Sequence, residues 1–231
     1  MINIPKTKKV MQTNANKRQN GAALLIMLVV LVLGSSYLIL SELNGAAPTL
    51  KRHSQVSKIL ADDIIEALHG YAVSYKRIPC PDTNGDGIGE TPPCDNMEGE
   101  LPWATLGIRR TDSWGRPFRY RGNNTFTADP IDPLAVAGEF NIRDNSNAPI
   151  TLANDADSPA AIVFSCGING IPDGNNDADS VANTDATCIN PGTPSADYVQ
   201  DTYSAGGFDD VLLWLPRDKL IGKMSAANNW P

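Results

Sequence analysis

The residues with the clearest chemical pattern lie between positions 82 and 90. Asp82, Asn84 and Asp86 occupy alternate positions, and Gly87 follows them. This arrangement matches the beginning of the D-x-[DN]-x-[DN]-G calcium loop, in which side-chain oxygens converge on one point where the Gly permits a sharp turn. Ca²⁺ takes about six to eight oxygen ligands, so the segment is a candidate cation loop.

Two more ligands are available further along the same segment. The carbonyl of Ile88 and the carboxylate of Glu90 stand at the seventh and ninth positions of such a loop. The twelfth position, where an EF-hand has a bidentate Glu, is Pro93, which excludes an EF-hand. The alternative is a turn without an ion, because Asn, Asp and Gly favour turns through their own hydrogen bonds. The predicted Ca²⁺ ligands are Asp82, Asn84, Asp86, Ile88 and Glu90.

The four cysteines bracket two polar loops. Cys80 and Cys94 enclose the segment just described, and Cys166 and Cys188 enclose a second stretch rich in Asp and Asn. We expect the disulfides Cys80–Cys94 and Cys166–Cys188, because each would close a polar loop that buries little apolar surface. The alternative, a Cys₄ zinc site, lacks the usual C-x-x-C pairs. The second loop also has oxygens at alternate positions and is a weaker cation candidate; these residues are Asp173, Asn175, Asp177 and Asp179.

The rest of the chain is organised around an apolar segment near the N-terminus. The run from Ala22 to Ser41 has no charged residue and meets the length of about 20 residues that a membrane-spanning helix needs. The first 21 residues contain five of the 19 basic residues and none of the 26 acidic ones. By the positive-inside rule, the leader stays in the cytoplasm and the residues after the helix are exported.

Three fates of this segment are compatible with its hydropathy. A secretory signal peptide would be cut at a small-x-small site, for which Gly45-Ala46-Ala47 is the candidate, although Pro48 follows it directly. An uncut signal anchor fits equally well. The third fate is a cut before the apolar run, between Gly21 and Ala22.

The segment from Lys17 to Leu25, with the sequence KRQNGAALL, resembles the cleavage junction of type IV prepilins and type II secretion pseudopilins. The resemblance implies that a prepilin peptidase cuts after Gly21 and that Ala22 becomes the N-terminus. It also implies that the apolar helix later packs in the core of a filament. Most members of the family have Glu at the fifth position after the cut, where this chain has Ile26. We interpret Ile26 as evidence for a minor subunit rather than a major pilin.

Helical periodicity resumes after the apolar run. Apolar residues recur at three- and four-residue steps from about Thr49 to Val73, which predicts an amphipathic helix that ends before Ile78-Pro79. The resemblance implies a pilin-like α+β fold, in which a long N-terminal α-helix packs on a small, mostly antiparallel β-sheet. The expected parts are a leader at 1–21, a membrane or filament-core helix at 22–48 and a periplasmic domain at 49–231.

Two later segments support this expectation. The sequence from Asp112 to Tyr120, DSWGRPFRY, resembles the Asp-x-Trp-Gly-x-Pro-x-x-Tyr segment of major pseudopilins, which enters the first strand of their sheet. We expect the side chains of Phe118 and Tyr120 to lie on one face of that strand and Trp103 and Trp114 to pack in the core. Further strands are expected at 160–166 and 208–215. The resemblance also suggests that Asp209 and Asp210 reach a cation near the end of the sheet.

The composition argues against several classes of function. The net charge is −7, and the exported part is more acidic because the leader holds only basic charges; nucleic acid and anionic lipid are therefore unsuitable partners. His53 and His69 are too far apart for one metal site and are expected at the surface or in an interface. No nucleophile motif or phosphate loop is present, so we expect no enzyme.

The sequence therefore predicts a minor pilin or pseudopilin in the bacterial inner membrane. Its C-terminal domain would lie in the periplasm, and the protein would reach a filament or the cell surface. The expected partners are other pilin or pseudopilin subunits, the prepilin peptidase and the membrane, with Ca²⁺ as the candidate cofactor. The competing prediction is a membrane-anchored periplasmic interaction domain that binds calcium and never enters a filament.

Overall fold

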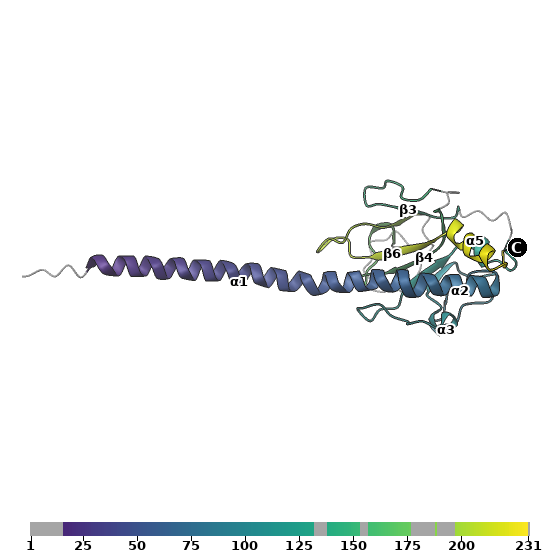
Figure 1. Ribbon diagram of the computed structural model, residues 1–231, viewed down its shortest axis with the longest axis horizontal. Helices are drawn as coiled ribbons and strands as arrows, with labels where there is room; N and C mark the ends of the chain where they lie inside the picture. Colours follow the sequence, from purple (N-terminus) through teal and green to yellow (C-terminus); the bar gives the residue numbers. More distant parts are fainter. Residues whose placement is uncertain (1–15, 132–137, 153–156, 177–187, 189–196, 231) are drawn as a thin grey trace, which may run out of the picture. The chain divides into compact units, whose positions relative to one another are not determined.

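The computed structural model describes residues 16–131, 138–152, 157–176, 188 and 197–230 (Figure 1). The chain divides into a first unit, Met1–Ala47, and a second unit, Pro48–Pro231. Helix α1 has the bounds Asn16–Lys58. Pro48 lies inside this helix.

The first unit contains an apolar helical segment. Residues Gly21–Leu40 have a mean hydropathy of 2.7, and none of this stretch is buried. The hydroxyls of Ser35 and Ser36 donate to the carbonyl of Val32 at 3.0 and 2.8 Å, so these polar groups are satisfied within the helix itself. Among the described residues, this is the one helix long and apolar enough to cross a membrane.

In the second unit the helical segment continues as a π-helix, η1 (Ile59–Ile64), and then as α2 (Ile65–Tyr75). Lys76 ends α2 in the left-handed conformation, with a φ of 60°. The helix predicted at 49–73 is therefore present, but the periodicity gave no sign of the π-helical turn.

The main sheet has four strands in the order β1-β2-β4-β6, and every neighbouring pair is antiparallel. A separate pair, β3 and β5, is parallel. The strands are β1 (Glu98–Glu100), β2 (Arg119–Gly122), β3 (Asn141–Arg143), β4 (Pro159–Ser165), β5 (Asp197–Val199) and β6 (Val211–Pro216). The remaining helices are α3 (Trp103–Leu106), α4 (Asn124–Thr127), η2 (Gly174–Asn176) and α5 (Arg217–Ala226). In Figure 1, α5 lies beside α2, with which it is in contact.

Alternate residues of β4 point into two different cores, because successive side chains of a strand face opposite sides of the sheet. Ala161 and Val163 belong to the core formed with Leu60, Ile64 and other helical residues. Ile162 and Phe164 belong to a second core, whose other members are Phe140, Ile142, Cys166, Cys188, Tyr198 and Leu212. The sheet is therefore covered on both faces.

The fold class is α+β, with an apolar N-terminal helix and a small, mostly antiparallel sheet. The strands expected near 160–166 and 208–215 are confirmed as β4 and β6. Phe118 and Tyr120 are both buried in the helix-side core, as their spacing predicted.

Candidate cation-binding site and membrane-anchoring segment

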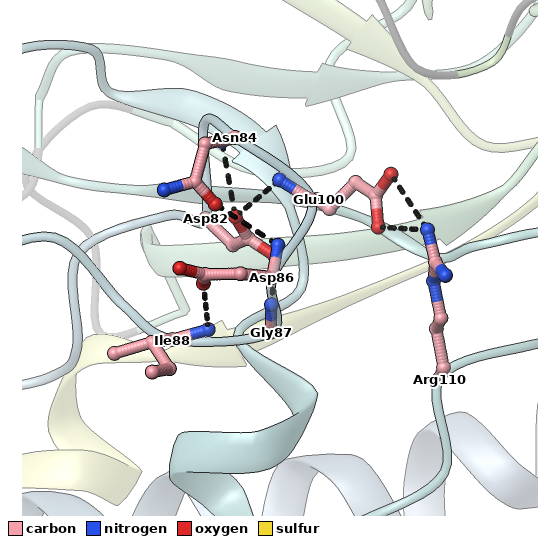
Figure 2. Close-up of polar contacts among 8 residues, drawn as sticks. Asp82, Asn84, Asp86, Gly87, Ile88, Glu100 and Arg110 are labelled. Atoms are coloured by element: carbon pink, nitrogen blue, oxygen red, sulfur yellow. Dashed lines mark hydrogen bonds and ion pairs between the residues drawn. The ribbon is translucent and has the colours of Figure 1, made fainter.

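The loop that begins at Asp82 is held by hydrogen bonds to its own backbone (Figure 2). The Asp82 carboxylate accepts from the N–H groups of Asn84 and Gly85 at 3.1 and 2.7 Å and from Gly87 at 2.6 Å. Asn84 Oδ1 accepts from Asp86 N at 2.9 Å. These bonds form a series of turns of the kind that Asp and Asn make through their side chains.

The other three predicted ligands also take part in local contacts or face solvent. Asp86 Oδ1 accepts from the N–H of Ile88 at 2.7 Å, and the Ile88 side chain is exposed. Glu90 Oε1 accepts from the hydroxyl of Thr83 at 2.6 Å. These hydrogen bonds fit the alternative of a self-capped turn, and the acidic groups here do not form a three-carboxylate cluster. Ca²⁺ binding by this loop stays a prediction.

A three-carboxylate cluster does occur at another place. Among the described residues, Asp173, Asp209 and Asp210 form the one group of three acidic side chains whose oxygens lie within 4.8 Å of one another. Asp209 and Asp210 directly precede β6, and Asp173 directly precedes η2. The structure thus brings together two segments that the sequence singled out separately. Asp177 and Asp179 lie outside the described residues.

Hydrogen bonds fix the positions of the three carboxylates. Asp173 Oδ2 accepts from the N–H groups of Asp209 and Asp210 at 2.7 and 3.3 Å. In return, Asp210 Oδ2 accepts from Asp173 N at 2.8 Å and from the amide of Asn176 at 2.9 Å. Asp209 Oδ2 accepts from Asn169 N at 3.0 Å. Each carboxylate is therefore held through one oxygen.

The second carboxylate oxygens of Asp209 and Asp210 have no hydrogen-bond partner among the described residues. Asp209 and Asp210 are only 5% and 1% exposed, and Oδ1 of each has no hydrogen-bond partner there. Burial raises the pKa of Asp210 well above its usual value, and burial together with the neighbouring Asp173 raises the pKa of Asp209. A bound cation would offset this cost, since buried charges require an opposite charge. Hard carboxylate oxygens suit Ca²⁺ or Mg²⁺.

A glycine allows the chain to approach this cluster closely. Gly167 has a φ of +58°, and a Cβ at this position would come within 2.3 Å of the Asp209 carbonyl oxygen. The neighbouring Cys166 forms a disulfide with Cys188, and Cys80 forms one with Cys94. Both disulfides are the sequence-local pairs that we predicted.

The histidines are not equivalent. His53 is half-buried on α1, with its ring 5.3 Å from that of Tyr203. His69 is 2% exposed and lies on α2. Of the two places expected for it, the surface or an interface, the structure excludes the surface. The helix α5 covers the face of α2 on which His69 lies, and periodicity within α2 did not reveal this partner.

The predicted processing site lies in the apolar helix. Gly21 and Ala22 are exposed residues of α1, and a Cβ at Gly21 would have no atom within 4 Å. The segment Gly21–Leu40 is compatible with a single membrane-spanning anchor by length and composition. No protein-family model, curated protein or solved structure matches this chain.

Proposed function

We propose that this chain is a minor subunit of a type IV pilus or of a type II secretion pseudopilus. A prepilin peptidase of the inner membrane cuts it after Gly21, and the domain after the apolar helix is in the periplasm. Its role is assembly rather than catalysis: the apolar helix packs against the helices of other subunits, and the exported domain presents contact surfaces.

The observation that carries this proposal is the exposed apolar helix at Gly21–Leu40, which follows a basic leader without acidic residues. Its large side chains are more than half exposed, for example 64% for Leu25 and 65% for Leu31. Such a surface is stable only in lipid or against other apolar helices. In this proposal, cleavage after Gly21 allows the helix to leave the lipid and to pack against the apolar helices of other subunits.

The exported domain supports the same proposal. A helical segment packs against an antiparallel sheet, and two disulfides link Cys80 to Cys94 and Cys166 to Cys188. Disulfides persist in oxidising compartments such as the bacterial periplasm. Ile26, at the fifth position after the proposed cut, is apolar and 64% exposed, which fits a subunit that neutralises no neighbouring amine in the filament core.

We further propose that the candidate cofactor, Ca²⁺, binds at Asp173, Asp209 and Asp210. The buried Oδ1 atoms of Asp209 and Asp210 support this position over the 82–90 loop, where the carboxylates of Asp82 and Asp86 cap backbone N–H groups. A cation there would join the start of β6 to the segment before η2 and stiffen this end of the domain.

The test is the N-terminal residue and mass of the protein recovered from its native membrane. We expect the chain to begin at Ala22 and the Gly21→Ala variant to remain uncut. Gly34→Ala is the matched control, because Gly34 lies in the same helix and a Cβ there would likewise have no atom within 4 Å; this variant should be processed normally.

The same measurement separates the alternatives. A chain that begins at Met1, or just after Ala47, would contradict the pilin proposal. It would instead favour an anchored or secreted periplasmic domain that binds a cation and never enters a filament.

A further inference from the structure

The first helical turns of the second unit have few contacts with the rest of the domain. Six of the eight residues 48–55 are exposed, and Val56 is the first buried residue of α1 in this unit. His53 is half-buried, and its ring lies 5.3 Å from that of Tyr203, in the loop between β5 and β6. The attachment of these turns to the domain therefore depends largely on His53.

A second contact of His53 leads to the three-carboxylate cluster. The imidazole hydrogen-bonds to the backbone of Asp210, and both residues line one cavity of about 110 Å³. Ser57 on the helix and Leu213 on β6 contribute to the same wall. Asp210 thus contacts the helix through its backbone and belongs to the candidate cation site through its carboxylate.

The loop between β5 and β6, residues 200–208, is tied to the cluster at both ends. At the β5 end, the amide of Asn176 accepts from the N–H of Val199 at 2.7 Å and donates to its carbonyl at 2.9 Å. The same amide donates to Asp210 Oδ2 at 2.9 Å. At the other end, the loop runs directly into Asp209 and Asp210. The position of the loop therefore depends on the geometry of the cluster.

We propose that a cation bound at Asp173, Asp209 and Asp210 holds the first turns of this helix on the domain. The buried Oδ1 atoms of Asp209 and Asp210 have no hydrogen-bond partner among the described residues, and without a cation a local opening that admits water relieves this cost. Such an opening moves the backbone of Asp210 and breaks its contact with His53. A cation that binds only the closed arrangement shifts the equilibrium toward it. This inference rests on the cation site proposed above and adds what its occupancy regulates.

The experiment measures how accessible the two histidines are to a reagent. The protein, purified from its membrane in detergent micelles, is treated with diethyl pyrocarbonate in the presence of Ca²⁺ or of a chelator, and mass spectrometry follows the modification of each histidine. We expect Ca²⁺ to slow the modification of His53 about fivefold or more, the lower end of the usual coupling between two sites. His69 is the internal control, since it is buried on α2 and does not line the cavity; its rate should not change.

Three variants test the route of the effect. Asp210→Asn should remove it, because this variant loses a carboxylate of the cluster but keeps the backbone contact with His53. Asp201→Asn is the matched control and should retain it, since Asp201 is an exposed acid of the loop that lines the same cavity. His53→Phe should weaken Ca²⁺ binding, measured by calorimetry, about fivefold or more, because coupling between two sites is reciprocal.

The outcomes separate this inference from the cation site itself. Ca²⁺ binding without slower modification of His53, equal slowing of both histidines, or unchanged affinity in His53→Phe would each overturn the inference and leave the site in place. An absence of Ca²⁺ binding to wild type would overturn both. Rapid modification of His69 identifies a variant that has misfolded, so a lost effect is not mistaken for a lost contact.

Discussion

The backbone of Gly87 lies directly against the indole of Trp103: a Cβ at Gly87 would come within 2.4 Å of a ring atom. The Gly87 carbonyl also accepts hydrogen bonds from the N–H groups of Ala104 and Thr105, at 2.9 and 3.1 Å. The loop that begins at Asp82 is therefore docked onto α3 by packing and by backbone hydrogen bonds.

The first prediction concerns this contact. Gly87→Ala should destabilise the protein by more than about 2 kcal/mol, because Ala adds a steric clash to an unfavourable backbone conformation, with φ at +86°. Gly107→Ala is the control, since its φ is +69° but no atom lies within 4 Å; it should cost only about 1 kcal/mol. Denaturant unfolding measures both. Equal losses would mean that the Trp103 contact does not hold the loop.

The second prediction concerns the cation. Adding Ca²⁺ to the purified full-length protein should raise its unfolding free energy, by about 2.7 kcal/mol when the ion is at a hundredfold excess over its Kd. Asp210→Asn and Asp173→Asn should abolish the gain, because each removes a charge from the three-carboxylate cluster. Asp86→Asn should retain it. If Asp86→Asn instead abolished the gain, the ion would bind in the 82–90 loop.

The third prediction concerns pH and His69. Burial lowers the pKa of His69 below its usual value of about 6.5, and Lys223 and Lys219 on α5 act in the same direction, although the Glu66 carboxylate opposes them. The unfolded chain therefore takes up a proton at a higher pH than the folded protein. Stability is complete above about pH 6.5 and falls below it, by at most about 1.4 kcal/mol per pH unit for one group.

Unfolding of wild type and His69→Gln between pH 7.5 and 5 tests this prediction. His53, whose pKa burial also lowers, remains in both proteins, so the difference in slope isolates His69. The variant should lose less stability than wild type as the pH falls. Identical slopes would contradict the prediction.

The fourth prediction concerns a buried ion pair between β1 and β2. Glu98 and Arg119 are paired, and both side chains are almost fully buried. The hydroxyl of Tyr198 donates to Glu98, and Arg121 donates to that hydroxyl at 2.9 Å. Glu98→Gln should destabilise the protein by about 3–5 kcal/mol, since it removes the negative charge that is paired with the buried Arg119 guanidinium.

The comparison for this ion pair is Asp63→Asn, which removes the half-exposed pair with Arg109. Surface pairs contribute about 0–1 kcal/mol, so this variant should unfold nearly as wild type does. A similar small loss for Glu98→Gln would show that the buried network adds no more than a surface contact.

Local sequence patterns were sufficient to predict the features that depend on neighbouring residues. The uncharged run after Gly21 predicted an apolar helix, because mean hydropathy is calculated over consecutive residues and needs no information on distant ones. The alternation of Phe118 and Tyr120 predicted a strand face, because side chains alternate along a strand. The pairing of Cys80 with Cys94 followed from the short loop between them. These features need only a few consecutive residues.

Features that join distant segments depend on how the chain folds. Asp173 meets Asp209 and Asp210 because β6 begins beside the loop that follows β4. His69 is buried because α5, far along the chain, covers α2. The Asp-x-Asn-x-Asp-Gly pattern is ambiguous for a related reason: the same oxygens serve an ion or the backbone, and the Asp82 carboxylate caps backbone N–H groups within its own loop. Strand order and packing fix such contacts, and no local pattern encodes them.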